Sequence, residues 1–153
     1  DDWPEIARNI FQLMRSEAGE EIVLEKNIFV ERILFNDSEK GLSDEAKKEY
    51  IRPFKNAGED RRPTLTWPRQ IPIDGSPEAV IDEVTKNGEF HKNSDIPKLF
   101  INADPGTILI GKQREFVRSW SNLKEVTVKG NHFVQEDSPH EIGEAIKVFI
   151  ETI

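Results

Sequence analysis

The sequence lacks cysteine altogether, and this absence excludes disulfide bonds, thiolate metal sites and a cysteine nucleophile. Histidine is scarce, so a catalytic imidazole has to belong to His91, His132 or His140. No apolar run approaches the about 20 residues that a membrane-spanning helix needs. The first residues, DDWPEIARN, also lack the basic and apolar regions of a signal peptide. We therefore expect a soluble, cytoplasmic protein.

Blocks of like charge are absent too. The 21 basic and 29 acidic residues give a net charge of −8 and are mixed along the whole chain. An acidic, evenly mixed surface does not attract phosphate groups, so we expect neither nucleic acid nor an anionic membrane as a partner. The 153 residues fit one domain, although a hydrophobic content of 36% leaves only a modest core.

Helical patterns dominate the chain up to residue 92. The apolar residues of EIARNIFQLMR recur at the spacing of one helix face. Helices are also expected over residues 20–34, over 43–52 with Ser43 as the N-cap, and over 76–93 with Ser76 as the N-cap. Prolines in residues 56–75 predict a long loop without regular structure.

The pattern changes after residue 96. PKLFINADPG predicts a buried strand that ends in a turn, and LKEVTVKG a second strand. GKQREFVRSW predicts an amphipathic helix, and SPHEIGEAIKVFIETI a closing helix with an apolar face. Ser138 and Glu141 have the spacing of a capping box at the start of the last helix. This order is the repeating unit of a parallel α/β sheet. Because two strands are too few for such a sheet, the chain is either an α-rich domain with a minimal sheet or the second half of a larger α/β protein.

His132 is the candidate for chemistry because it follows a strand, at the carboxyl edge where open α/β sheets place their sites. Position alone fits a catalytic base and a structural loop histidine equally well. His91 and His140 are expected on the surface, at helix ends. No G-x-S-x-G or G-x-D-x-G elbow, phosphate loop or cluster with metal-ligand spacing occurs. The chain therefore offers a possible base without a nucleophile, and no metal site is expected.

Several long segments carry a family resemblance. GNHFVQEDSPHEIG, RRPTLTWPRQIPI and IPKLFINADPG resemble the haloalkane dehalogenases and the related Renilla-type luciferase. The resemblance implies an α/β fold, specifically the C-terminal portion of an α/β-hydrolase fold in which a helical cap precedes the last two parallel strands and their helices. Residues 1–92 would be mostly helical cap and returning helix, and residues 93–153 the C-terminal part of the core.

The resemblance also implies a reaction. In that family an aspartate displaces halide from carbon to form an ester, and a histidine, here His132, acts as general base and activates water to hydrolyse it. The nucleophile, the acid partner of the histidine and the halide-binding residues belong to an N-terminal half, which is the expected protein partner. The expected substrates are a small apolar halogenated compound and water, with no cofactor.

Pocket residues carry over from the same resemblance. Without it, each large apolar side chain is explained as well by ordinary core packing. The positions that match substrate-lining residues are Phe11, Phe29, Ile33, Trp67, Pro68, Ile71, Thr107, Ile108 and Phe133.

One segment departs from the family pattern. Where relatives have an apolar segment resembling LPGxIxRxL, this chain reads LFNDSEKGL, so we expect a polar, loosely held loop near Asp37. Two other functions stay open: a coelenterazine-dependent, luciferase-like monooxygenase, and an inactive complementation fragment. Thr107 and Ile108 resemble the dehalogenases more than the luciferase.

Overall fold

The computed structural model describes residues 3–153, which divide into two compact units. The first unit contains residues 3–37 and 41–81, and the second contains residues 38–40 and 82–153. The predicted division between a cap up to residue 92 and a core from residue 93 stays a prediction, and its residues 1 and 2 lie outside the described residues.

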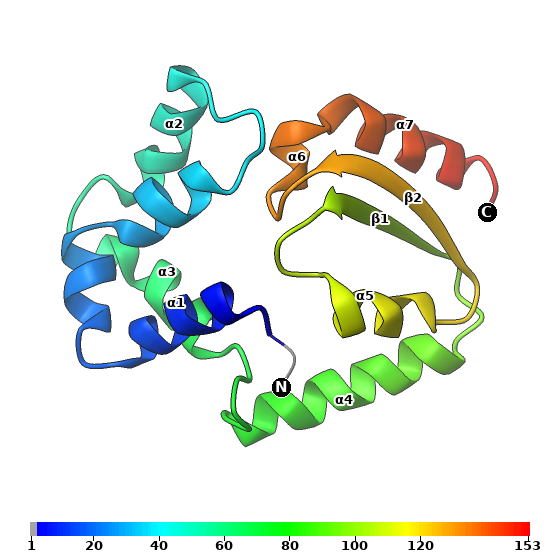
Figure 1. The fold of residues 1–153 in the computed structure, drawn as a ribbon, viewed down its shortest axis with the longest axis horizontal. Coiled ribbons are helices and arrows are strands. Elements are labelled where there is room, and N and C mark those ends of the chain that lie inside the picture. The colour runs from blue at the N-terminus through cyan, green and yellow to red at the C-terminus, as the bar shows by residue number, and fades with distance from the viewer. Residues whose placement is uncertain (1–2) are drawn as a thin grey trace. The chain divides into compact units, whose positions relative to one another are not determined.

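The first unit is helical (Figure 1, blue to green). The helices predicted over residues 5–15 and 43–52 form, and Ser43 caps the second by accepting a hydrogen bond from the Ala46 backbone nitrogen at 3.1 Å. The predicted helix over residues 20–34 consists of two wide π-helical segments that Asn27, with a positive φ of 52°, separates. The elements are α1 (Glu5–Arg15), η1 (Glu20–Glu25), η2 (Phe29–Leu34), α2 (Asp44–Ile51), η3 (Arg52–Phe54), η4 (Glu59–Arg61), α3 (Arg62–Arg69) and the start of α4 (Glu78–Asn93).

The prediction of a long irregular loop over residues 56–75 is wrong, because η4 and α3 lie within it. Pro63 stands in the first turn of α3, where a backbone N–H has no partner inside the helix. Pro68 stands in the last turn and ends the helix soon after. Prolines at both ends of a helix of eight residues therefore bound it instead of preventing it.

The core of the first unit gathers side chains from α1, η1 and α3. Leu65 of α3 is fully buried, which is why the predicted loop becomes a helix with an apolar face. The core residues are Phe11, Met14, Val23, Leu24, Leu65 and Ile73.

A buried arginine joins the turns of the first unit. Arg61 is only 8% exposed. Its guanidinium donates to the backbone oxygens of Phe54 at 2.8 Å, Leu24 at 2.9 Å, Glu25 at 2.7 Å and Lys55 at 3.2 Å. Since carbonyls at helix ends lack partners inside the helix, this one side chain satisfies acceptors at the ends of η1 and η3.

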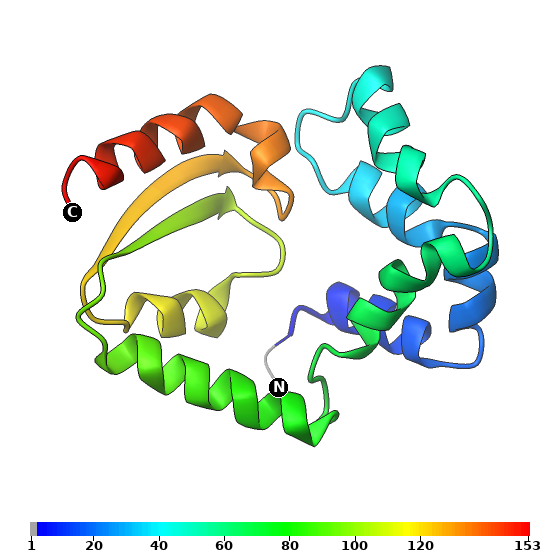
Figure 2. The ribbon, with the colours of Figure 1, turned by 180° about the vertical axis from the view of Figure 1, so that it is seen from behind.

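The second unit is built on two parallel strands, as predicted. β1 (Lys98–Pro105) pairs with β2 (Leu123–Gly130) along their whole length, from Lys98 opposite Leu123 to Pro105 opposite Gly130. α7 (Pro139–Ile150) runs along one face of this pair, and α5 (Gly111–Arg118) along the other, with residues 82–93 of α4 beyond α5 (Figures 1 and 2). The predicted order of strand, helix, strand and helix is confirmed, with a short α6 (Val134–Asp137) added before α7.

The predicted capping box at the start of α7 is wrong. The Ser138 side chain makes no capping hydrogen bond, and its hydroxyl instead donates to the backbone oxygen of Lys129 at 2.6 Å. Ser138 thus attaches the start of α7 to β2, which is a tertiary contact that a local spacing rule does not anticipate.

The second unit exposes many large apolar side chains, so the purified chain should enhance the fluorescence of the dye ANS, which binds open apolar surface. Addition of an N-terminal half should reverse the enhancement if that half covers these faces. Dye fluorescence at the level of a compact control protein would contradict the expectation. The exposed residues are Val84, Phe90, Ile96, Leu109, Phe116, Ile146, Val148, Ile150 and Ile153.

Candidate active site

Both strands of the second unit end at the same edge, and four predicted site residues follow them there. The Gly106 backbone nitrogen donates to the Gly130 oxygen at 3.0 Å, so the two chain segments remain side by side just beyond the paired residues. Thr107 and Ile108 follow β1, and His132 and Phe133 follow β2. The structure therefore brings these two pairs to one edge of the sheet, the carboxyl edge.

The loop after β1 is held by an arginine from α5. Arg114 donates to the backbone oxygens of Ala103 at 2.9 Å, Pro105 at 3.1 Å and Leu109 at 3.3 Å. Gly106 has a φ of 69°, and a Cβ added there would come within 2.9 Å of the Ala103 oxygen. Glycine is needed at this turn for both reasons, and the turn presents Thr107 and Ile108 half-buried at the edge.

The histidine loop, residues 131–133, leaves β2 at Gly130 and leads into α6. His132 is exposed, and its ring contacts that of Phe133 edge-on, with centroids 5.0 Å apart. The Asn131 backbone nitrogen donates to Asp137 Oδ2 at 3.0 Å and so closes the loop at its base. A Cβ at Gly130 would lie 2.8 Å from Asp137, so the absence of a side chain there lets the carboxylate approach.

Asp137 is a buried, hydrogen-bonded residue that the sequence did not single out. Burial raises its pKa, but N–H groups of Glu39, Lys40 and Asn131 and the hydroxyl of Ser38 hydrogen-bond to the carboxylate and lower it to about 2. In sequence, the acids around it are explained by the start of a helix. Its partner Lys40 is 97 positions away, and no local pattern indicates a contact over that separation.

The expectation of a loosely held polar loop is wrong for residues 38–40. Ser38 Oγ donates to Asp137 Oδ1 at 2.7 Å, and the Lys40 backbone nitrogen donates to the same oxygen at 3.0 Å. Glu39 pairs with Lys129 of β2 at 2.7 Å. The polar side chains of Ser38 and Glu39 therefore have specific partners.

Acid should weaken this part of the molecule. The pKa of Asp137 in the folded protein is about 2 and lies below the ordinary aspartate value of 3.8. A carboxyl group whose pKa is lower in the folded than in the unfolded protein stabilises the fold at pH values above its unfolded-state pKa. This stabilisation is lost as the pH falls through the folded-state pKa. We expect the wild-type chain to lose stability between about pH 4 and pH 2, and the Asp137→Asn variant to show a smaller loss over that interval. Urea unfolding across this pH range measures it, and parallel curves for the two proteins would contradict it.

The other predicted pocket residues belong to the first unit. Phe29 and Trp67 meet edge-on with ring centroids 6.2 Å apart, and Trp67 remains 57% exposed. Phe11 is a member of the buried core and Pro68 is also buried. Ile33 and Ile71 are half-buried and pack against that core. A pocket-lining role for these six residues stays a prediction, as does the role of the residues near His132.

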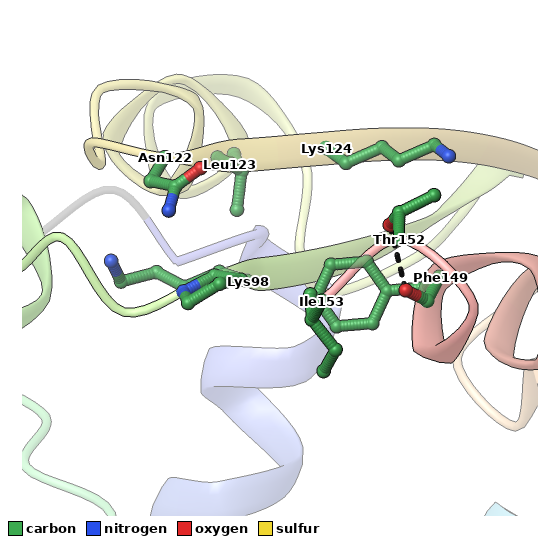
Figure 3. A pocket seen from close by; sticks show the side chains of 8 residues that line it. Lys98, Asn122, Leu123, Lys124, Phe149, Thr152 and Ile153 are labelled. Carbon is green, nitrogen blue, oxygen red and sulfur yellow. Dashed lines mark hydrogen bonds between the residues drawn. The ribbon is translucent and has the colours of Figure 1, made fainter.

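A pocket of about 310 Å³ lies at the opposite edge of the sheet, where both strands begin (Figure 3). Its Lys98 ammonium donates to backbone oxygens of Ser94, Ile96 and Ser121 and thereby ties the segments before the two strands together. No predicted site residue lines this pocket. Within residues 3–153 no group of side chains could hold a metal ion, and no helix is long and apolar enough to cross a membrane.

Comparison with known proteins finds relatives that match nearly the whole chain. A haloalkane dehalogenase of Mycolicibacterium smegmatis is 52% identical over 155 residues, and one of Sphingobium indicum is 51% identical over 149 residues, covering 100% and 97% of this chain. The crystal structure of the haloalkane dehalogenase DbeA from Bradyrhizobium elkani superimposes with a TM-score of 0.91 at 32% identity, over 97% of this chain. Over nearly its whole length the chain is therefore similar to haloalkane dehalogenases.

The match covers only part of the dehalogenases. The chain spans about half the length of the curated relatives, 50% in both cases, and corresponds to their C-terminal half. It also spans 52% of the DbeA chain, which supports the C-terminal portion of an α/β-hydrolase fold. The coelenterazine h 2-monooxygenase of Renilla reniformis is 43% identical over 155 residues. A scan against models of protein families gives no match.

Proposed function

We propose that this chain supplies the cap, the histidine and part of the pocket of a haloalkane dehalogenase-like hydrolase. An N-terminal half supplies the aspartate nucleophile and the acid that orients the histidine. The nucleophile forms an ester with the alkyl group and releases halide, and His132 removes a proton from the water that hydrolyses the ester. The substrates are small apolar halogenated compounds and water.

The observation that carries this proposal is the position of His132, two residues beyond the end of β2, in a chain that is 52% identical to a dehalogenase. The exposed imidazole lies at the carboxyl edge of the parallel strands, next to the loop that carries Thr107 and Ile108. A base at that edge is accessible to substrate, and the half-buried apolar side chains beside it favour an apolar ligand.

Halide release tests the proposal. The chain is mixed with the separately expressed N-terminal half of a relative, or of its own protein, and bromide release from a short bromoalkane is measured. We expect turnover only from the mixture, because this chain contains no G-x-D-x-G elbow to carry a nucleophile. Bromide release by the chain alone would contradict its dependence on a second half. A mixture that assembles but releases no bromide would overturn the dehalogenase proposal.

A monooxygenase acting on coelenterazine is the second candidate, because the 43% identity to the Renilla reniformis enzyme also extends over the whole chain. The same assembled protein is given coelenterazine in air and its light emission is recorded. Light without bromide release would favour the monooxygenase, and bromide release without light the dehalogenase.

A further inference from the structure

A single buried carboxylate, that of Asp137, hydrogen-bonds to two segments that are far apart in the sequence. Asp137 is 1% exposed. Its Oδ1 accepts from Ser38 Oγ at 2.7 Å and from the Lys40 backbone nitrogen at 3.0 Å. Its Oδ2 accepts from the Asn131 backbone nitrogen at 3.0 Å. We call Ser38, Lys40, Asn131 and Asp137 the Asp137 clamp, because one side chain joins residues 38–40 to the base of the histidine loop.

Contacts around the carboxylate strengthen the same connection. The Lys40 ammonium donates to the Asp137 backbone oxygen, and Lys129 of β2 pairs with Glu39 at 2.7 Å. Residues 38–40 therefore contact the chain both before and after the histidine loop. Displacement of these three residues removes contacts on both sides of that loop.

The clamp requires an ionised carboxylate. Donors approach both of its oxygens, and a carboxylate has only acceptors to offer them. An asparagine amide has the same shape but presents an NH₂ group in place of one oxygen, so it faces an N–H or O–H donor on one side. In a buried site, a donor opposed by a donor loses its hydrogen bond and gains no water in exchange.

We propose that Asp137 is a positioning residue for His132. The same carboxylate binds residues 38–40, so movement of that segment moves the imidazole. The histidine lies in a loop whose base is fixed by the bond from Asn131 to Asp137. A general base works only within hydrogen-bond reach of its water, and displacement by about 1 Å lowers the rate strongly. The part that concerns the reaction rests on the proposed function.

Amide hydrogen exchange on the full chain tests the structural part. In Asp137→Asn, exchange at Asn131 and at Lys40 should both rise at least about tenfold, because the amide has one acceptor oxygen in place of two and the segment that loses its bond also loosens the other. Ser38→Ala removes a donor from the distant segment only, and it should still raise exchange at Asn131 if the two segments move together. The matched control is Glu141→Gln, which removes a carboxylate charge at an exposed position in the first turn of α7.

Kinetics on the chain assembled with an N-terminal half test the catalytic part. Asp137→Asn and Ser38→Ala should slow ester hydrolysis about 10-fold or more while leaving the first release of halide and kcat/KM unchanged, because only the base is displaced and kcat/KM reports the steps up to halide release. Glu141→Gln should match the wild type. If Asp137→Asn fails to fold, Ser38→Ala still decides the question.

The outcomes separate the Asp137 clamp from the proposed dehalogenase function. If exchange in Asp137→Asn and Ser38→Ala rises at Lys40 but not at Asn131, and ester hydrolysis is unchanged, the positioning role of the Asp137 clamp is overturned. An assembled wild-type protein that releases no halide would overturn the proposed function and the positioning role in it. Coupled exchange in the variants would then still establish the connection between residues 38–40 and the histidine loop.

Discussion

Replacing His132 by alanine should leave the first release of halide intact and stop the reaction there. In the proposed mechanism the carboxylate displaces halide without the histidine, whereas hydrolysis of the ester needs the base. We expect about one halide per assembled molecule, and a fall in steady turnover of at least 100-fold, within the about 10²–10⁴-fold that general-base catalysis contributes. Rapid-quench measurement of halide, with intact mass to detect the trapped alkyl group, would record both effects.

His140→Ala is the matched control for that experiment. His140 lies exposed in the first turn of α7, eight positions from His132 in the same part of the chain. Its replacement should leave both the burst and the steady turnover unchanged. Steady turnover in His132→Ala at the wild-type rate would rule out the general-base role, whereas loss of the burst as well would point to a failure to assemble.

Replacing Arg61 by methionine should destabilise the first unit severely. Arg61 donates to backbone oxygens of Leu24, Glu25, Phe54 and Lys55, and methionine fills similar space without a donor. Buried carbonyls that lose their partner cost about 1–3 kcal/mol each, and Leu24 retains a bond from a backbone N–H, so a total of roughly 3–5 kcal/mol is expected. Urea unfolding followed by far-UV circular dichroism measures the change.

The neighbouring arginine provides the comparison. Arg62 pairs with Glu59 and Glu20, with its side chain 36% exposed, and hydrogen bonds from Arg62 lower the pKa of both carboxyl groups. Exposed ion pairs contribute little to stability because water solvates the separated charges well. Arg62→Met should therefore shift the urea midpoint far less than Arg61→Met. Equal shifts would mean that the buried bonds of Arg61 are not the source of the effect.

The strands and the last helices could be predicted from sequence, because their signals are local. LKEVTVKG alternates and ends in glycine, and the observed β2 has these same bounds, Leu123–Gly130. The position of His132 at the carboxyl edge followed from the order of elements alone. The prolines of residues 56–75 misled because a proline at a helix end and a proline in a loop have the same local signature.

The Asp137 clamp could not be predicted in this way. Asp137 and Ser138 stand where a helix begins, and there an acid and a serine are explained by capping. Their observed partners, Lys40 and Lys129, are fixed by the tertiary fold. The family resemblance named His132 and a set of pocket residues, but buried polar residues whose partners are distant in sequence carry no motif of their own.

The membership of residues 38–40 in the second unit limits how this protein can be recombined with its relatives. A chimaera that exchanges the first 81 residues as one block would replace Ser38 and Lys40 and leave Asp137 from the original parent. The buried carboxylate would then face whatever donors the new segment happens to offer. Stable hybrids should be those that take residues 38–40 and Asp137 from the same parent. These positions therefore have to be exchanged together despite their separation along the chain.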